Sequence, residues 1–225
     1  MKVSTHFDSN VQHAKKTVDH IYKIYLKSIN IKDCFTLVLS GGNTPKIIFD
    51  ELVRDYTASI NWEKVHIFWL DERCVGPEHE DSNYKLAKDH LLDYLEPGSV
   101  HRMEGELEPK LAASRYEDVI RDFFDLQEGE IPAFDLILLG MGEDGHCASL
   151  FPQSSELHEK KRLVVSTEKQ YNSHTRISLT LPVINMSAKV LMIGSQKKLD
   201  VFNDKQRALP IHQVSQENMK VIVAI

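Results

Sequence analysis

Four short apolar runs, rich in β-branched and aromatic residues, alternate with segments of helical periodicity, and this alternation constrains the fold more than any other feature. The runs cover residues 34–39, 65–70, 134–139 and 190–193, and we expect another strand at 221–225. Strands that alternate with helices form βαβ units, in which the strands run parallel and the helices cover the sheet. We therefore predict an α/β, Rossmann-like fold with a mostly parallel open sheet flanked by helices.

Segments between these runs repeat apolar residues at the spacing of a helix. The spacing predicts helices over residues 46–56, 84–95 and 109–124. Residues 176–180 alternate polar and apolar side chains, which predicts a half-buried strand, and Pro182 indicates a helix start after it. A small additional sheet is compatible with the predicted fold class. We expect loops at 74–82 and 153–162.

The length fits one α/β domain or two closely packed lobes, and we expect a single α/β domain over residues 1–225 that folds around its own core. Of the 225 residues, 42% are hydrophobic and 27% are charged, and no repeat or long linker divides them. The net charge of −6 argues against nucleic-acid binding, although a small anion needs only a local pocket of donors.

The termini and cysteines point to a cytoplasmic protein. No apolar leader opens the sequence, and no run approaches the ~20 apolar residues of a membrane span, so we predict no membrane contact. Cys34, Cys74 and Cys147 are widely spaced and odd in number, which suits reduced thiols rather than disulfides or a zinc site.

The first candidate site is the turn after the run 34–39, which comprises Ser40, Gly41, Gly42, Asn43 and Thr44. Paired glycines let the backbone approach a ligand, and we expect Thr44 to cap a helix that begins at Pro45. Free N–H groups at such a helix start favour phosphate. The spacing differs from that of nucleotide-binding loops, so it favours a small phosphoester over ATP or NAD. A plain tight turn is the alternative.

The second candidate site follows the next run, where Asp71, Glu72 and Arg73 stand at the carboxyl end of a predicted strand. Ligands of open α/β sheets gather beyond these ends. Arg73 can hold a carboxylate or phosphate through two hydrogen bonds, and Asp71 can accept hydrogen bonds from sugar hydroxyls. An exposed cluster of ion pairs is the alternative.

The third candidate site is the loop after the run 134–139, where three glycines within six residues present Glu143, Asp144 and His146. The His146 imidazole can exchange protons with a ligand near neutral pH. Asp144 can orient the imidazole if the chain turns sharply between the two residues. Cys147 is a weak candidate nucleophile, because sequence neighbours need not point together.

Five ordered motifs together resemble the 6-phosphogluconolactonases, a family related to the glucosamine-6-phosphate deaminases. They are LSGGNTP (39–45), LDERCV (70–75), DSNY (81–84), LGMGEDGHCASLFP (139–152) and RISLTLPVIN (176–185). The deaminases carry a glutamate soon after their Asp-Gly-His segment, whereas residues 147–152 contain none. They also carry tyrosine where Arg73 stands. Both differences favour the lactonase branch.

The resemblance implies hydrolysis of 6-phospho-D-glucono-1,5-lactone to 6-phosphogluconate in the oxidative pentose phosphate pathway, without a metal or cofactor. The substrate phosphate would lie on the turn 41–44, held by Arg176 and Lys197, and His146 would act near the lactone carbonyl. Asn43 replaces the serine usual in the first motif, which leaves backbone contacts to phosphate intact. Many relatives continue beyond the position of Ile225 into a further helix.

We hypothesise that neutral His146, oriented by Asp144, takes a proton from the water that attacks C1 and later protonates the ring oxygen. Arg73 or a backbone N–H would stabilise the oxyanion. A glucosamine-6-phosphate deaminase/isomerase and a non-catalytic sugar-phosphate sensor remain the alternatives. The only partner we expect is a small phosphorylated sugar lactone, and we expect a monomer or weak dimer.

Overall fold

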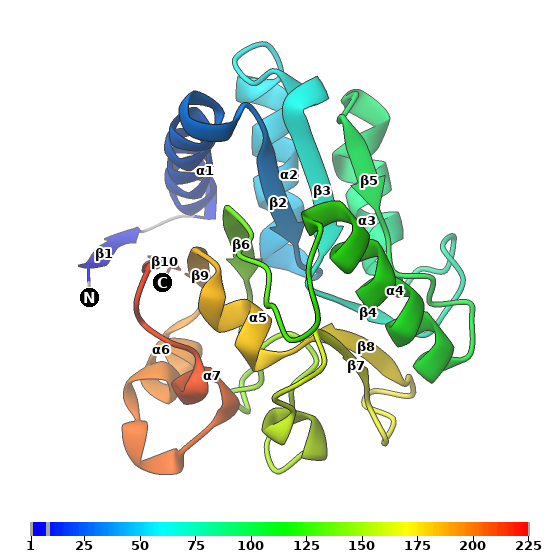
Figure 1. The fold of residues 1–225 in the computed structure, drawn as a ribbon. Coiled ribbons are helices and arrows are strands. Elements are labelled where there is room, and N and C mark those ends of the chain that lie inside the picture. The colour runs from blue at the N-terminus through cyan, green and yellow to red at the C-terminus, as the bar shows by residue number, and fades with distance from the viewer. Residues whose placement is uncertain (1, 8–9, 225) are drawn as a thin grey trace.

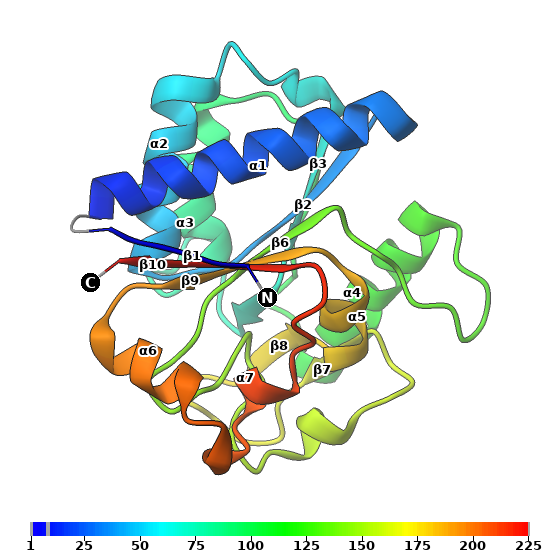
Figure 2. The same ribbon diagram turned by 90° about the vertical axis from the view of Figure 1, so that its left-hand side faces the viewer.

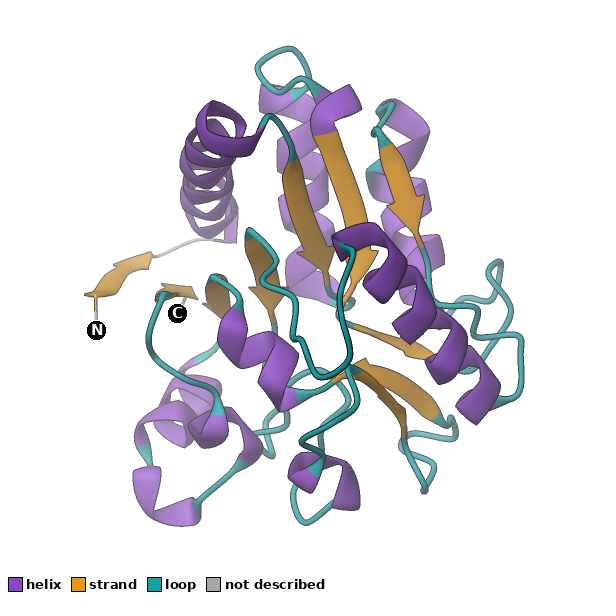
Figure 3. Cartoon of the chain, in the orientation of Figure 1, coloured by secondary structure: helices purple, strands orange, loops and turns teal. Residues whose placement is uncertain are grey.

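The computed structural model describes residues 2–7 and 10–224, and a seven-stranded sheet runs through it (Figures 1 and 3). In spatial order its strands are β1 (Lys2–Phe7), β10 (Met219–Ala224), β9 (Lys189–Ile193), β6 (Leu136–Leu139), β2 (Phe35–Leu39), β3 (Val65–Trp69) and β5 (Ser99–His101). Every neighbouring pair is parallel. The central strands β2, β6 and β9 are buried at every position, which explains why nearly all their residues are apolar.

Helices cover both faces of this sheet (Figure 2). They are α1 (Asn10–Lys32), α2 (Asn43–Tyr56), α3 (Asn83–His90), α4 (Pro109–Phe124), α5 (Leu181–Met186), α6 (Gln196–Asn203) and α7 (Pro210–Gln213). In Figure 2, α1, α2 and α3 lie on one face and the other four lie on the opposite face. No helix within the described residues is long and apolar enough to cross a membrane.

A second, antiparallel sheet has the order β4 (Asp71–Arg73), β8 (Arg176–Leu179), β7 (Val164–Ser166). Leu70 links the two sheets, because its N–H donates to Leu39 in β2 and its carbonyl accepts from Leu179 in β8. The chain therefore passes from the carboxyl end of β3 directly into the second sheet, and it carries Asp71 and Arg73 with it.

The order of strands in the main sheet reverses beside β2. The chain goes from β2 to β3 and β5 on one side, and later places β6, β9 and β10 on the other side. Two loops that leave neighbouring strands in opposite directions open a crevice at such a point, which is where open α/β sheets bind ligands. The carboxyl ends of β2 and β6 carry the first and third candidate sites.

The structure confirms the α/β class, the mostly parallel sheet and the small additional sheet. Several details differ from the sequence expectations. The strand expected to be half-buried at 176–180 is β8, which is buried at every position. The expected helix 84–95 ends at His90, and Leu91 (φ −140°, ψ −60°) leads into a 3₁₀ turn. Residues 155–158 of the expected loop 153–162 form another 3₁₀ turn. The expected strand 221–225 begins at Met219, and Ile225 lies outside the described residues.

Candidate active site

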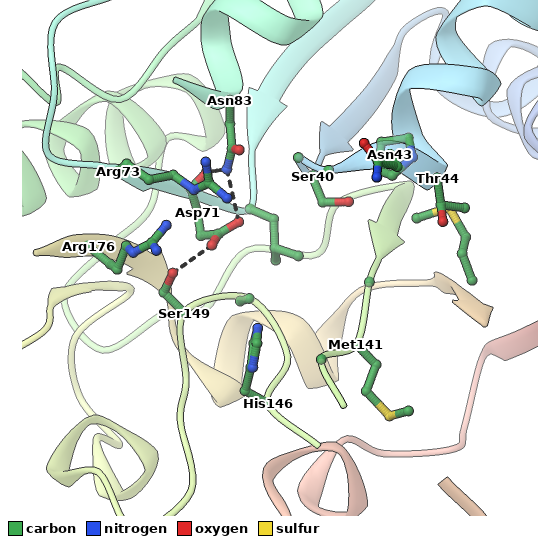
Figure 4. Close-up of a pocket in the computed structure, with 18 of the residues that line it drawn as sticks. Ser40, Asn43, Thr44, Asp71, Arg73, Asn83, Met141, His146, Ser149 and Arg176 are labelled. Atoms are coloured by element: carbon green, nitrogen blue, oxygen red, sulfur yellow. Dashed lines mark hydrogen bonds between the residues drawn. The ribbon is translucent and has the colours of Figure 1, made fainter. Parts of the chain in front are cut away.

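A cavity of about 310 Å³ lies at the carboxyl ends of β2, β3, β6 and β9 (Figure 4). All three candidate loops reach it. The predicted site residues that line it are Ser40, Gly41, Gly42, Asn43, Thr44, Asp71, Arg73, His146 and Arg176. The sequence therefore located this cavity through segments that are far apart along the chain.

The turn after β2 presents the first turn of α2 to the cavity. Gly42 is the residue before the helix and has φ +100°, a conformation that favours glycine. The expectation that Thr44 caps the helix is wrong, because α2 already begins at Asn43 and has no side-chain cap. The first N–H groups of a helix have no intrahelical partner, and here no side-chain cap accepts from them, so they suit an anion. The buried Ser40 hydroxyl also has no partner among the described residues.

Asp71 is held in place by two neighbours that line the same cavity. Ser149 donates its hydroxyl hydrogen to Asp71 Oδ2 at 2.6 Å. The Asn83 amide donates to the Asp71 carbonyl at 2.8 Å, and its Oδ1 would stand 1.7 Å from a Cβ on Gly41. Glycine at 41 is therefore required by the close approach of Asn83, and the Asp71 carboxylate has a fixed direction in the cavity.

Glu72 points away from the cavity, as strand alternation requires for the residue between Asp71 and Arg73. Its buried carboxylate accepts hydrogen bonds from Ser82 Oγ and from the backbone N–H groups of Arg73, Asn83 and Tyr84. Burial raises the pKa of Glu72, although these hydrogen bonds oppose the rise. Glu72 thus fixes the start of α3 against β4, which the sequence did not reveal.

Arg73 and Arg176 stand directly opposite each other in the β4–β8 pair. Like charges at such a position destabilise a sheet unless other groups compensate. Burial, and then the charge of Arg73, lower the pKa of the Arg176 guanidinium. Among the described residues, the buried Nε atoms of both arginines lack hydrogen-bond partners. Because both arginines line the cavity, this pair of cations suits an anion there.

Each arginine also anchors one loop beside the cavity. Arg73 donates to the carbonyl of Asp81 at 2.5 Å, and Arg176 donates to the carbonyl of Tyr171 at 2.8 Å. His174 joins the two loops, because its Nε2 lies 3.0 Å from Asp81 Oδ2. The 74–82 loop is therefore tied to the segment before β8.

The loop that carries His146 makes a turn tight enough to bring the imidazole against Asp144. The Gly142 N–H donates to the His146 carbonyl at 2.9 Å, and Gly145 adopts φ +80°. Within this turn, Nδ1 of His146 lies 2.6 Å from Asp144 Oδ1. Because a carboxylate accepts, the hydrogen is assigned to Nδ1, which leaves Nε2 unprotonated in the neutral ring. The side chain is 33% exposed and projects into the cavity (Figure 4).

Gly142 makes room for the imidazole. A Cβ on this glycine would lie 2.2 Å from Cε1 and 2.3 Å from Nδ1 of His146. Cys147 is fully buried next to this loop, and burial raises the pKa of its thiol to about 12. Because the thiolate is the nucleophilic form, Cys147 is poorly suited to attack a substrate.

The structure does not bring Lys197 into the cavity. Its Nζ lies 2.6 Å from Glu143 Oε2, and both side chains are largely exposed. The next residue, Lys198, lines the cavity instead. Both lysines belong to the first turn of α6, where adjacent residues point in different directions, so a sequence pattern alone does not choose between them.

Several lining residues were not singled out from the sequence. They are Asn83, Met141, Ala148, Ser149, Phe151, Asn172, Met192 and Lys198. All of them except Asn172, Met192 and Lys198 lie within the quoted family motifs, so the motifs held a signal for them. Asn172 had no such signal, because its place depends on the fold of the segment before β8. No group of three or more His, Cys, Asp or Glu side chains in the described part of the chain is arranged for a metal ion.

Comparisons with known proteins show the family of this chain. Residues 8–223 match the family described as glucosamine-6-phosphate isomerases/6-phosphogluconolactonase. A 6-phosphogluconolactonase of Synechocystis sp. is 40% identical over 168 residues, covering 72% of this chain and 68% of its own length. One of Treponema pallidum is 32% identical over 206 residues, covering 88% and 85%.

Solved structures show the same fold. The crystal structure of 6-phosphogluconolactonase from Thermotoga maritima has a TM-score of 0.85 at 27% identity, covering 99% of this chain and 98% of its own. One from Shewanella baltica has a TM-score of 0.84 at 28% identity, covering 100% and 97%. This chain therefore belongs to the glucosamine-6-phosphate isomerase/6-phosphogluconolactonase family, on its lactonase branch.

Proposed function

We propose that this chain hydrolyses 6-phospho-D-glucono-1,5-lactone to 6-phosphogluconate, a step of the oxidative pentose phosphate pathway. The observation that carries the proposal is the position of His146, a histidine paired with Asp144 in a cavity that has the start of α2 on one side and two arginines on the other. The substrate has one permanent anion, its phosphate, and develops a second on the carbonyl oxygen during attack. A base between these two groups of donors suits such a substrate.

The phosphate binds at the start of α2 in this proposal. The uncapped N–H groups after Gly42 and the unpartnered Ser40 hydroxyl support the assignment, because helix starts attract phosphate. A lysine of α6 supplies the positive charge. The family resemblance favours Lys197, whereas the lining of the cavity favours Lys198. A comparison of the two single alanine variants distinguishes them.

Arg73 stabilises the oxyanion at the other end of the cavity, and we assign Arg176 to the same end. In Figure 4 the two arginines lie on one side of His146, whereas Asn43 and Thr44 lie on the other. This arrangement favours a role for Arg176 at the lactone carbonyl over the phosphate contact that the family resemblance implied. Donors aimed at a developing oxyanion are often the largest single contribution to catalysis.

Hydrolysis then needs two proton transfers, and His146 makes both. Nε2 takes a proton from a water molecule while the water oxygen bonds to C1, and Asp144 stabilises the imidazolium that forms. The bond from C1 to the ring oxygen then breaks, and the imidazolium gives its proton to that oxygen. Asp71, held by Ser149, accepts a hydrogen bond from a sugar hydroxyl and orients the ring.

An assay of freshly generated lactone, compared with its spontaneous opening, tests the activity. We expect the purified protein to open the lactone far faster than buffer and to release no ammonia from glucosamine-6-phosphate. Ammonia release would instead support the deaminase. Tight binding of the phosphorylated ligand without any acceleration would support a sensor, and either result would contradict the proposal.

A further inference from the structure

His146 packs against the first ring of a stacked pair. The imidazole centroid lies 4.7 Å from that of Phe151 with the two planes tilted by 40°, and the Phe151 ring stacks on Tyr171 at 3.5 Å with only 7° between the planes. The hydrogen bond to Asp144 fixes the position of Nδ1, but a ring held at one atom can still pivot. The plane of the imidazole, and hence the direction of Nε2, therefore depends on the side chain that packs against it.

Tyr171 is held firmly enough to support that stack. Its N–H donates to the His174 carbonyl at 2.8 Å, and Asn172 and Ser173 between them adopt φ 49° and 68°. Positive φ at both central residues is the pattern of a tight type I′ turn. The Tyr171 carbonyl also accepts a hydrogen bond from Arg176. The ring thus stands on a short turn that is attached directly to β8.

We propose that Tyr171 is a positioning residue, which holds the Phe151 ring against His146 and thereby aims Nε2 at the water in the cavity. Phe151 is buried and lines the same cavity as His146, whereas Tyr171 stacks on Phe151 and is not among the residues that line this cavity. The role rests on the proposed function, because it concerns the aim of the same base. It needs the aromatic ring of Tyr171 and not its hydroxyl.

An NMR measurement tests the position of the imidazole without any substrate. Aromatic rings shift the signals of neighbouring protons, so the Cε1–H signal of His146 reports where Phe151 lies. We expect Tyr171→Ala to move this signal and Tyr171→Phe to restore it. The signals of His13 and His212, whose rings contact Ile222 and Val201, should stay in place and show that the variant is folded.

Kinetics give the second readout. We expect Tyr171→Ala to lower kcat roughly 2- to 10-fold, with little change in KM. This is the rate factor that corresponds to the interaction energy of one aromatic pair. Tyr171→Phe should recover the rate. The matched control is Tyr94→Ala, because Tyr94 is a 60% exposed aromatic in the 3₁₀ turn after α3, and it should change neither readout.

An unmoved His146 signal in Tyr171→Ala would overturn the inference. Tyr171→Phe as impaired as Tyr171→Ala would also overturn it, since the hydroxyl would then be the active group. A moved and restored signal in a protein that does not hydrolyse the lactone would support the positioning role while refuting the proposed function, so the two failures are distinguishable.

Discussion

Substitution of Gly142 by alanine tests how closely the His146 imidazole must be placed. The new Cβ would stand 2.2 Å from Cε1, 2.3 Å from Nδ1 and 2.7 Å from Asp144 Oδ1, whereas ordinary contact begins near 3.4 Å. The ring must therefore move by about 1 Å, and it loses its hydrogen bond to Asp144. A misplacement of about 1 Å can cost on the order of 10²-fold in rate, so we expect kcat to fall by about that factor.

The assay for this variant is the initial rate of lactone opening, corrected for spontaneous hydrolysis, together with a thermal unfolding curve. Gly142 does not have positive φ, so alanine can adopt its backbone conformation and the fold should persist. Gly76→Ala is the matched control, because a Cβ there meets nothing within 4 Å and the residue does not line the cavity. A folded Gly142→Ala protein with the wild-type kcat would refute the reasoning.

Three further experiments test other parts of the site. Because we place Arg176 at the lactone carbonyl, Arg176→Ala should lower kcat/KM by the same factor on the phosphorylated lactone and on glucono-1,5-lactone. A fall confined to the phosphorylated substrate would instead place Arg176 at the phosphate. Lys198→Ala should raise KM for the phosphorylated lactone more than Lys197→Ala does, because only Lys198 lines the cavity, and the reverse order would favour the family pattern. The pKa of Cys147 is raised to about 12, so its side chain stays a neutral thiol as pH rises from about 7 to 9. Mass spectrometry should therefore find Cys147 unalkylated by iodoacetamide in the folded protein over this range. Rapid alkylation that increases with pH would contradict its burial.

The sequence predicted the elements whose cause is local. The continuous apolar runs of β2, β3, β6 and β9 follow from burial on both faces, and α4 was predicted over its observed bounds, Pro109–Phe124. The 23-residue helix α1 was not predicted. Its signal was present, because Ala14, Val18, Ile21 and Tyr25 are buried and stand at helical spacing.

In the site, too, the sequence predicted contacts within one loop and missed contacts between distant segments. The contact between His146 and Asp144 could be anticipated, since both lie in one glycine-rich loop, and the structure supplies the turn that joins them. The opposition of Arg73 and Arg176 could not, because it depends on the register between two strands that are distant in the sequence. The stack of Tyr171 on Phe151 likewise depends on a tight turn that places one segment beside another.

The most direct measurement is the turnover of purified His146→Ala on freshly generated 6-phosphogluconolactone, at saturating substrate and with the fold verified by its unfolding curve. General acid–base assistance contributes about 10²–10⁴-fold, so we predict a fall in kcat of that size relative to the wild-type protein. A folded His146→Ala protein that turns over the lactone at the wild-type rate would contradict the central claim.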